Sequence, residues 1–329
     1  MDIMIRGLAF AAAALCAAVM GFAIQRGATC TVAAVDQLVR QRRATRLLAL
    51  VEASLWVCGG LLLAQRLAPP APLSAGYALT ARALAGAVLL GLGAFVNRAC
   101  VFGAVARFGN GEWAYALTPA GFYLGCLAAP ALFGAAAPPR LPQGSFVASA
   151  PPALAWGVAA AFAWRLAAAA RANGTGGLKA LLRERLWSPH AATSVIGVAF
   201  LAMLLLVGAW AYTDALADLA RGMARGLGAR LLLAACLLAG AVAGGRSAGR
   251  PRPAAGAAGS PARCLAGGAL MGAGSLLIPG SNDGLILLGM PMLWPHAWAA
   301  FGAMCASIAA AQWAQARLAG RRRAAAPGT

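Results

Sequence analysis

The chain of 329 residues is 61% hydrophobic and 11% charged, with a mean hydropathy of +0.75. Soluble domains are about 45–50% apolar and about 25% charged, so this composition excludes an ordinary soluble domain and also a disordered chain. The net charge is +19, but the basic residues fall between apolar blocks, which indicates a membrane protein and not a nucleic-acid-binding domain. The eight cysteines have no CxxC or Cys/His spacing, so we expect neither a metal nor a cofactor.

Nine stretches of the chain are long and apolar enough to cross a bilayer, which takes about 20 mostly apolar residues in a helix. The sequence therefore predicts an all-α polytopic membrane protein with about nine transmembrane helices. The predicted spans are residues 5–24, 46–66, 79–97, 113–135, 153–170, 190–209, 229–245, 263–279 and 296–317. Gln25 and Arg26 follow the first stretch where a signal peptide would have small cleavage-site residues, so we expect a span there.

Four further segments are too short to cross. They hold polar residues, prolines or glycines at what should be membrane depth, where irregular backbone is tolerated only if it is buried or lines a cavity. We interpret them as re-entrant half-helices that meet near the centre, with positive N-terminal ends that favour an anion. These segments are residues 28–39, 99–108, 212–222 and 283–291.

Four clusters of basic residues indicate which ends of the spans face the cytoplasm. The clusters are Arg40, Arg42, Arg43 and Arg46; Arg171, Lys179, Arg183 and Arg185; Arg246, Arg250, Arg252 and Arg263; and Arg317, Arg321, Arg322 and Arg323. With nine spans, this pattern places the N-terminus outside and the C-terminus in the cytoplasm. Arg221 and Arg225 fit less well, because they fall on the predicted outer side beside Asp214 and Asp218.

An internal repeat relates the two halves of the chain. Residues 84–93 and 265–274 share the pattern L-A-G-x-x-L-x-G-x-G at an offset of 181 residues, and the same offset pairs Trp113 with Trp294. The basic clusters give the two copies opposite directions across the membrane. Inverted repeats are the architecture of many transporters, with the substrate site near the midplane. We therefore divide the chain into a first transmembrane repeat with a linking helix (1–170), a cytoplasmic connector (171–189), a second, inverted repeat (190–317) and a basic cytoplasmic tail (318–329).

Two cysteines differ from the other six. Cys30 and Cys100 begin or lie within polar, glycine-marked half-helices, whereas the other six lie among Ala and Leu and are expected to be small hydrophobic side chains. Arg26 and Arg98 stand shortly before these two cysteines. An arginine at membrane depth is usually functional, so these two are candidates to attract the substrate, or else they snorkel to the interface.

The second half offers a polar segment after a helix break at Pro279-Gly280. Ser281, Asn282 and Asp283 either only cap the next helix or also line a passage. The offset of 181 places Ser281 opposite Cys100.

The remaining polar residues do not indicate an enzyme, because no nucleophile elbow, phosphate loop or carboxylate dyad is present. His190 and His296 stand at span starts, where an interfacial position is expected. Glu52 lies inside a predicted span, where it is either a proton site or an ion-pair partner near Arg46.

These motifs together resemble the YeeE/YedE sulphur transport family over about residues 5–317. The motifs are Gln25-Arg-Gly-x-x-Cys30, the glycine-rich span that leads to Cys100-x-x-Gly103, and the Gly267-Gly268 span that leads to Gly280-Ser-Asn-Asp-Gly. The resemblance implies a bacterial inner-membrane protein that takes up thiosulfate through pseudo-symmetric halves, with cysteine thiols as hydrogen-bond donors in a central constriction. Carried over by motif, those thiols are Cys30 and Cys100.

The chain departs from the family at a third cysteine, in the second half. Ser281 stands at the position that the repeat indicates, and Ala269 follows the Gly-Gly pair. A hydroxyl is still a donor, so an anion passage is compatible with the change.

The predicted function is thus a transporter or channel-like permease for thiosulfate or a related small sulphur anion. The alternative is a membrane accessory protein that docks a cytoplasmic sulphur- or selenium-handling enzyme through the connector 171–189. A metal or drug cation as solute is disfavoured because acidic residues are few.

Overall fold

The computed structural model describes residues 2–67, 76–135, 138–141, 145–173, 184–223, 226–249 and 260–325. Within these ranges the chain is helical, with no strand beyond an isolated bridge between Tyr77 and Arg140. The long helices are α1 (Asp2–Arg26), α3 (Thr45–Leu67), α4 (Ala81–Asn97), α6 (Leu117–Phe133), α8 (Pro152–Asn173), α10 (Pro189–Val207), α12 (Leu227–Ser247), α13 (Pro261–Leu277) and α15 (Pro295–Ala325). The short ones are α2 (Thr31–Gln41), α5 (Val101–Gly109), η1 (Trp113–Ala116), α7 (Phe146–Ser149), α11 (Tyr212–Ala220), α14 (Asn282–Gly284) and η3 (Leu285–Gly289).

Each of the nine predicted spans overlaps one of the long helices. In the described part of the chain, six helical segments are long and apolar enough to cross a membrane, and a seventh is added if the bent pair of α13 with α14–η3 counts as one. Two of the six join a long helix to the short one after it, at Met4–Gln41 and Ala81–Gly109. The chain is therefore an all-helical polytopic membrane protein, and the count of nine spans stays a prediction.

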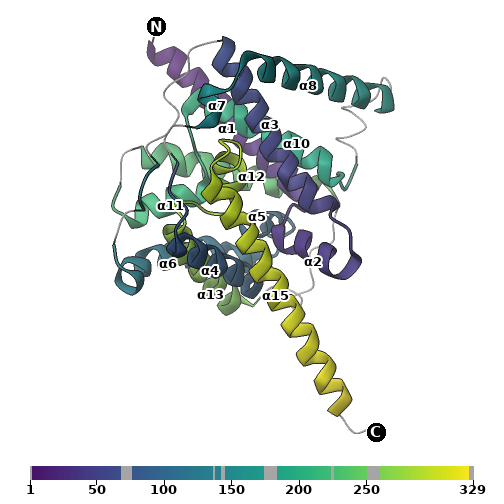
Figure 1. Cartoon of the computed structure of the whole chain (residues 1–329), viewed down its shortest axis with the longest axis vertical. Helices are drawn as coiled ribbons and strands as arrows, with labels where there is room; N and C mark the ends of the chain where they lie inside the picture. The colour runs from purple at the N-terminus through teal and green to yellow at the C-terminus, as the bar shows by residue number, and fades with distance from the viewer. Residues whose placement is uncertain are drawn as a thin grey trace.

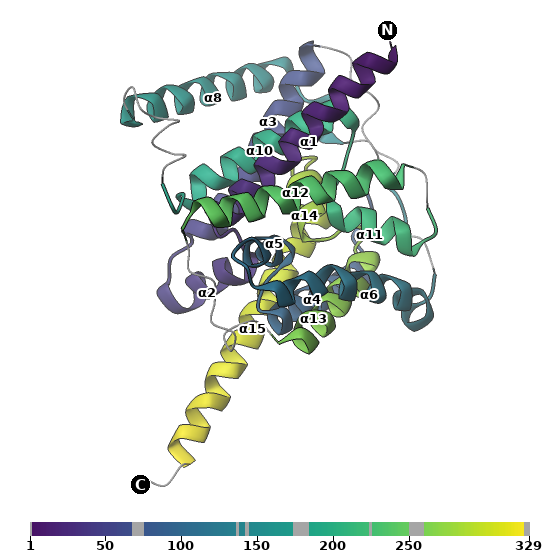
Figure 2. The same cartoon turned by 180° about the vertical axis from the view of Figure 1, so that it is seen from behind.

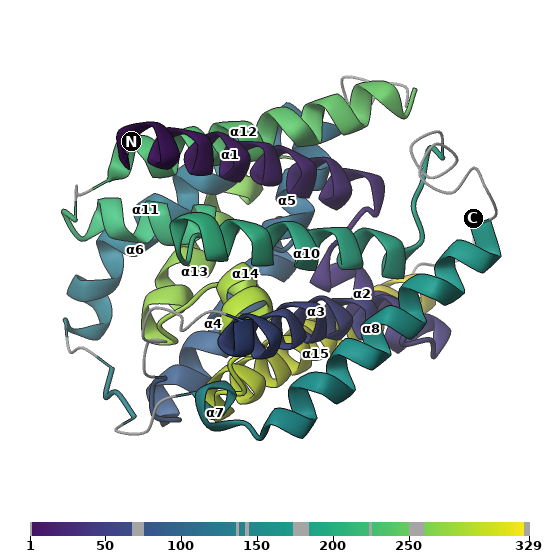
Figure 3. The ribbon, with the colours of Figure 1, turned by 90° about the horizontal axis from the view of Figure 1, so that it is seen from above.

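The helices form two packed groups. In one, α1 lies between α10 and α12, and α3 packs on α10; Figure 3 shows these helices running side by side. In the other, α13 packs between α4 and α6, and α15 packs on α4, as Figure 2 shows from behind. The far end of α15 extends away from both groups toward the C-terminus (Figure 1).

The short helices begin close to where the sequence predicts them. Segments 28–39, 99–108, 212–222 and 283–291 correspond to α2, α5, α11 and α14–η3. Breaks in the backbone precede three of them, with positive φ at Ala28, Arg98 and Pro279. Most of the predicted connector, including Lys179 and Arg183, lies outside the described residues, as do Arg225, Arg250 and Arg252.

The offset of 181 residues recurs in the positions of the helices. α1 ends at Arg26 and α10 ends at Val207, 181 residues later. α2 begins at Thr31 and α11 begins at Tyr212, again 181 residues later. The packing follows the same correspondence. The contact of α1 with α12 corresponds to the contact of α10 with α3. In the same way, the contact of α13 with α6 corresponds to that of α4 with α15, and the contact of α5 with α12 corresponds to that of η3 with α3.

The glycines of the repeated pattern lie where α4 and α13 cross. A Cβ on Gly86 would come within 2.7 Å of the Gly274 carbonyl oxygen, and one on Gly274 within 2.6 Å of the Gly86 carbonyl oxygen. Gly93 and Gly267 meet in the same reciprocal way, at 2.8 Å in each direction. Small residues let helix backbones approach closely in lipid, where helix association depends on packing. This contact is also self-complementary, because each copy presents the same pattern to the other.

Candidate functional site

Residues at the starts of three short helices contact one another in the buried interior. The Thr31 backbone N–H, at the start of α2, donates to Cys100 Sγ at 3.1 Å. The Thr31 hydroxyl donates to Asn282 Oδ1, at the start of α14, at 3.0 Å. All three residues are fully buried. Thr31 thereby joins Cys100, which caps α5 in the first half, to Asn282, which begins α14 in the second half.

The start of α11 completes this cluster. The Tyr212 hydroxyl donates to the Val101 carbonyl at 3.2 Å. Tyr212 corresponds to Thr31, and Val101 to Asn282, at the same offset of 181 residues. The contacts between the two halves are thus matched here at the level of single residues.

Cys30 stands immediately before Thr31 and is half-buried. Its thiol lies against Gly103, where a Cβ would come within 2.5 Å of Cys30 Sγ. The glycine of the Cys100-x-x-Gly103 pattern therefore makes room for the other cysteine. Both cysteines are free thiols.

Cys30 opens into a cavity of about 450 Å³, called here the Cys30 cavity. Its lining includes Cys30, Arg46, Arg98, Gly103, Arg107 and Glu112. Arg107 forms an ion pair with Glu112 at 3.1 Å. Three guanidinium groups against two acidic side chains, those of Glu112 and Asp36, give this cavity a net positive lining.

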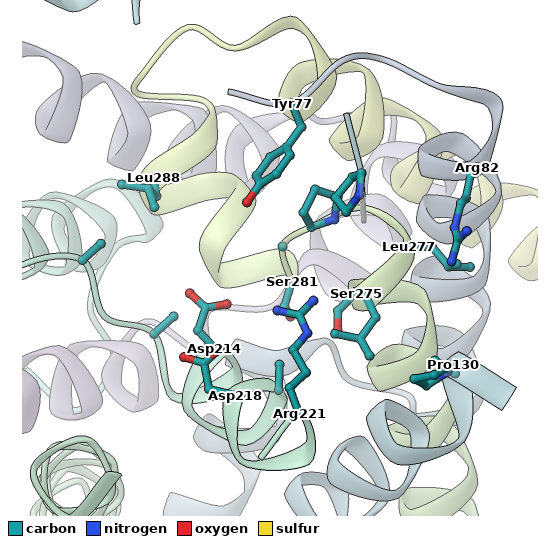
Figure 4. Close-up of a pocket in the computed structure, with 18 of the residues that line it drawn as sticks. Tyr77, Arg82, Pro130, Asp214, Asp218, Arg221, Ser275, Leu277, Ser281 and Leu288 are labelled. Carbon is teal, nitrogen blue, oxygen red and sulfur yellow. The ribbon is translucent and has the colours of Figure 1, made fainter. Parts of the chain in front are cut away.

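A second cavity, of about 700 Å³, lies against the polar segment of the second half and is called here the Ser281 cavity. Its lining includes Arg82, Asp214, Asp218, Arg221, Ser275 and Ser281. Figure 4 shows the side chains of Asp214 and Asp218 from α11, and of Arg221 directly after it, converging near Ser281.

None of the described residues lines both cavities. Cys30 faces one and Ser281 the other, and the residues that follow them, Thr31 and Asn282, are hydrogen-bonded to each other. Corresponding positions of the two cavities differ in chemistry, since Arg98 in the Cys30 cavity matches Pro279 in the Ser281 cavity at the offset of 181 residues.

The two predicted substrate-attracting arginines lie in different surroundings. Arg98 lines the Cys30 cavity. Arg26 is 2% exposed and lines neither cavity. Its guanidinium donates to the Glu184 carbonyl and, at 3.0 Å, to Ser247 Oγ, and its own carbonyl accepts from the Trp187 N–H. These contacts fasten the end of the connector to α1 and α12.

The structure also shows polar contacts that the sequence analysis did not predict. Asp283 Oδ1 accepts from the Thr213 hydroxyl at 2.6 Å and from the Gly284 N–H at 3.1 Å. Asp214, which lines the Ser281 cavity, lies close to this pair, because a Cβ on Gly284 would be 3.9 Å from its carboxylate oxygens. The signal that could have found them is the polar start of the segment 212–222, whose Thr213 and Asp214 are unusual at membrane depth.

Glu52 forms an ion pair, but its partners are not near Arg46. Its carboxylate contacts Arg165 of α8 and His190 of α10. Arg46 instead lines the Cys30 cavity. The described residues hold no group of three or more His, Cys, Asp or Glu that could bind a metal ion.

The family of the chain is shown by comparison with known proteins. No curated protein sequence matches it significantly. A family model described as Sulphur transport matches residues 26–310. This range contains Cys30, Cys100 and Ser281 and the short helices α2, α5, α11 and α14. The chain therefore belongs to the YeeE/YedE sulphur transport family.

Proposed function

We propose that this membrane protein conducts thiosulfate, or a closely related small sulphur anion, between the Ser281 cavity and the Cys30 cavity. The observation that carries the proposal is the pair of cavities on either side of one buried contact, in which Thr31 binds both Cys100 and Asn282. Membership of the sulphur transport family gives the class of solute. In this state the contact is closed, and conduction requires that it open.

The chemistry of the contact suits a soft anion. Cys30 and Cys100 are the N-caps of α2 and α5, so the positive ends of both helices lie in this region. A thiol is a weak, polarisable donor, and conduction needs sites that bind the solute without trapping it. Ser281 and Asn282 supply hydroxyl and amide donors from the second half. The thiols act as neutral donors, with no covalent step.

The arrangement of the halves supports an inverted repeat. Self-complementary glycine contacts between α4 and α13, and matched contacts at an offset of 181 residues, are what a two-fold axis between the halves produces. With the arginine clusters in the cytoplasm, nine spans and an external N-terminus, the Cys30 cavity faces the cytoplasm of the bacterial inner membrane. The Ser281 cavity then faces outward.

We assign the attraction of the anion to the guanidinium groups of Arg46, Arg98 and Arg107, which line the Cys30 cavity. A positively lined cleft with low-dielectric walls concentrates anions. Arg26 contributes indirectly, because its hydrogen bonds hold the end of the connector against α1 and α12.

Uptake by a bacterial strain that lacks thiosulfate import tests the route. We expect Cys30→Ala and Cys100→Ala each to lower uptake by about fivefold, the effect of losing a hydrogen bond worth about 1 kcal/mol. Cys236→Ala is the matched control, because Cys236 lies on α12 away from both cavities and should import like the wild type. Wild-type uptake by both Cys30→Ala and Cys100→Ala would show that the assigned route is wrong.

The same protein in liposomes, tested with a panel of sulphur oxyanions, identifies the solute. Flux in vesicles that contain no other protein would separate a transporter from an accessory subunit, which moves nothing by itself. A flux of sulfate as fast as that of thiosulfate would contradict the role of the soft thiol donors.

A further inference from the structure

Two carboxyl groups near Ser281 are not explained by anion passage alone: Asp214 lines the Ser281 cavity, and Asp283, two residues after Ser281, lies outside its lining. Asp283 is 3% exposed. Asp214 lies close to it, since a Cβ on Gly284, the next residue, would be 3.9 Å from each Asp214 carboxylate oxygen. Figure 4 shows the Asp214 carboxylate beside Ser281. The two acids come from α11 and α14, so the fold brings them together from separate elements.

Neither carboxyl group has an ion-pair partner among the described residues. Asp218, one turn further along α11, does have one in Arg230. The Ser281 hydroxyl oxygen beside the pair is buried and makes no hydrogen bond in the described part of the chain. The other charged or titratable groups around the pair are Tyr77, Arg82, Cys126, Arg140, Tyr212, Asp218, Arg221 and Arg230.

An anion that reaches Ser281 passes Asp214 in the cavity lining and comes within two residues of the buried Asp283. Two like charges 4 Å apart repel each other by about 4 kcal/mol at an effective dielectric constant of about 20. A dianion next to two charged carboxylates would meet a barrier of this order at the entrance to the closed contact. The corresponding residues in the first half, Ala33 and Phe102, carry no charge, so this pair of carboxylates has no counterpart in the other half.

We propose that Asp214 and Asp283, with the Ser281 hydroxyl, form a proton site, and that a proton bound there crosses the membrane together with the anion. The proton binds a carboxylate from the Ser281 cavity and removes the repulsion. Asp283 follows Asn282 directly, so opening of the Thr31–Asn282 hydrogen bond exposes Asp283 to the Cys30 cavity, where the proton leaves. This inference rests on the proposed function.

The test uses the purified full-length protein in liposomes that contain a trapped pH-sensitive dye, with the membrane potential clamped at zero by valinomycin and potassium. On addition of thiosulfate outside, we expect the lumen to acidify in step with thiosulfate influx. A tenfold inward proton gradient should raise thiosulfate accumulation by up to about tenfold for each coupled proton.

The variants Asp214→Asn and Asp283→Asn should lower the ratio of protons to thiosulfate at least fivefold, whatever influx remains. Asp218→Asn is the matched control, because Asp218 lies on the same helix and the same cavity but is paired with Arg230, and it should keep the wild-type ratio. The wild-type measurement decides the question even if a variant does not fold.

The outcomes separate the two proposals. Thiosulfate influx without acidification, or influx that requires a sodium gradient, would overturn the proton site and leave the anion route standing. An Asp214→Asn protein with the wild-type ratio would also overturn the site. No thiosulfate influx into wild-type vesicles would instead refute the proposed function.

Discussion

The hydrogen bond from Thr31 to Asn282 joins residues that are 251 positions apart in sequence and belong to different halves. Both residues are fully buried, so loss of the Thr31 hydroxyl would leave the side-chain oxygen of Asn282 (Oδ1) without a partner, which costs about 1–3 kcal/mol of stability. The amide nitrogen of Asn282 already makes no hydrogen bond within the described residues. The closed contact is therefore held by few interactions, which suits a contact that must open in each cycle.

Thr31→Val tests this role, because valine keeps the shape of threonine and removes the hydroxyl. We expect the contact to open more readily and to discriminate less, so the ratio of thiosulfate to sulfate flux in liposomes should fall severalfold. Thr193→Val is the matched control: Thr193 is also buried, but its hydroxyl donates within α10, to the Pro189 carbonyl at 2.9 Å. Equal selectivity in both variants would contradict a gating role for Thr31.

At the scale of helices, the crossing of α4 and α13 sets the distance between the two halves. Its glycines bring backbone against backbone, and α13 also packs on α6, where a Cβ on Gly272 would come within 2.0 Å of the Phe122 carbonyl oxygen. The short helices α5 and α14 follow α4 and α13 directly, so the position of this crossing fixes where Cys100 and Ser281 stand.

Gly274→Val should push α4 and α13 apart. Overpacking of this kind costs about 1–3 kcal/mol, so we expect the melting temperature of the detergent-solubilised protein to fall by several degrees. Gly157→Val provides the comparison, because a Cβ on Gly157 of α8 meets nothing within 4 Å. A Gly274→Val protein as heat-stable as the Gly157→Val protein would show that the crossing is not tightly packed.

For the molecule as a whole, local patterns in the sequence predicted the helices well. Apolar length indicated the long helices, and the glycine pattern gave the offset that relates the halves. Contacts between distant segments were less accessible. The partners of Glu52 are 113 and 138 residues away, and Arg26 binds residues of the connector and α12, so neither arrangement is encoded in nearby residues.

The acidic pair was missed for a related reason. Asp214 and Asp283 belong to separate short helices, and in the sequence Asp214 stands out only as a charge near Arg221. The offset that relates the halves pairs Asp214 with Ala33, so the repeat itself gives no signal for an acid at this position. Departures from the internal symmetry are where the two cavities acquire different chemistry.

The closed contact between the cavities leads to a prediction about access from the two sides of the membrane. Cys30 lines one cavity and Ser281 the other, and no described residue lines both.

In a background without the other cysteines, a membrane-impermeant thiol reagent should label Cys30 from the cytoplasmic face, in inside-out vesicles. A Ser281→Cys substitution in a background that also lacks Cys30 should be labelled from the outer face, in right-side-out vesicles. Thiosulfate should slow both reactions, since the anion occupies the same route. Labelling of both positions from a single face would mean that the two cavities open to the same side, and the barrier between them could not then control transport across the membrane.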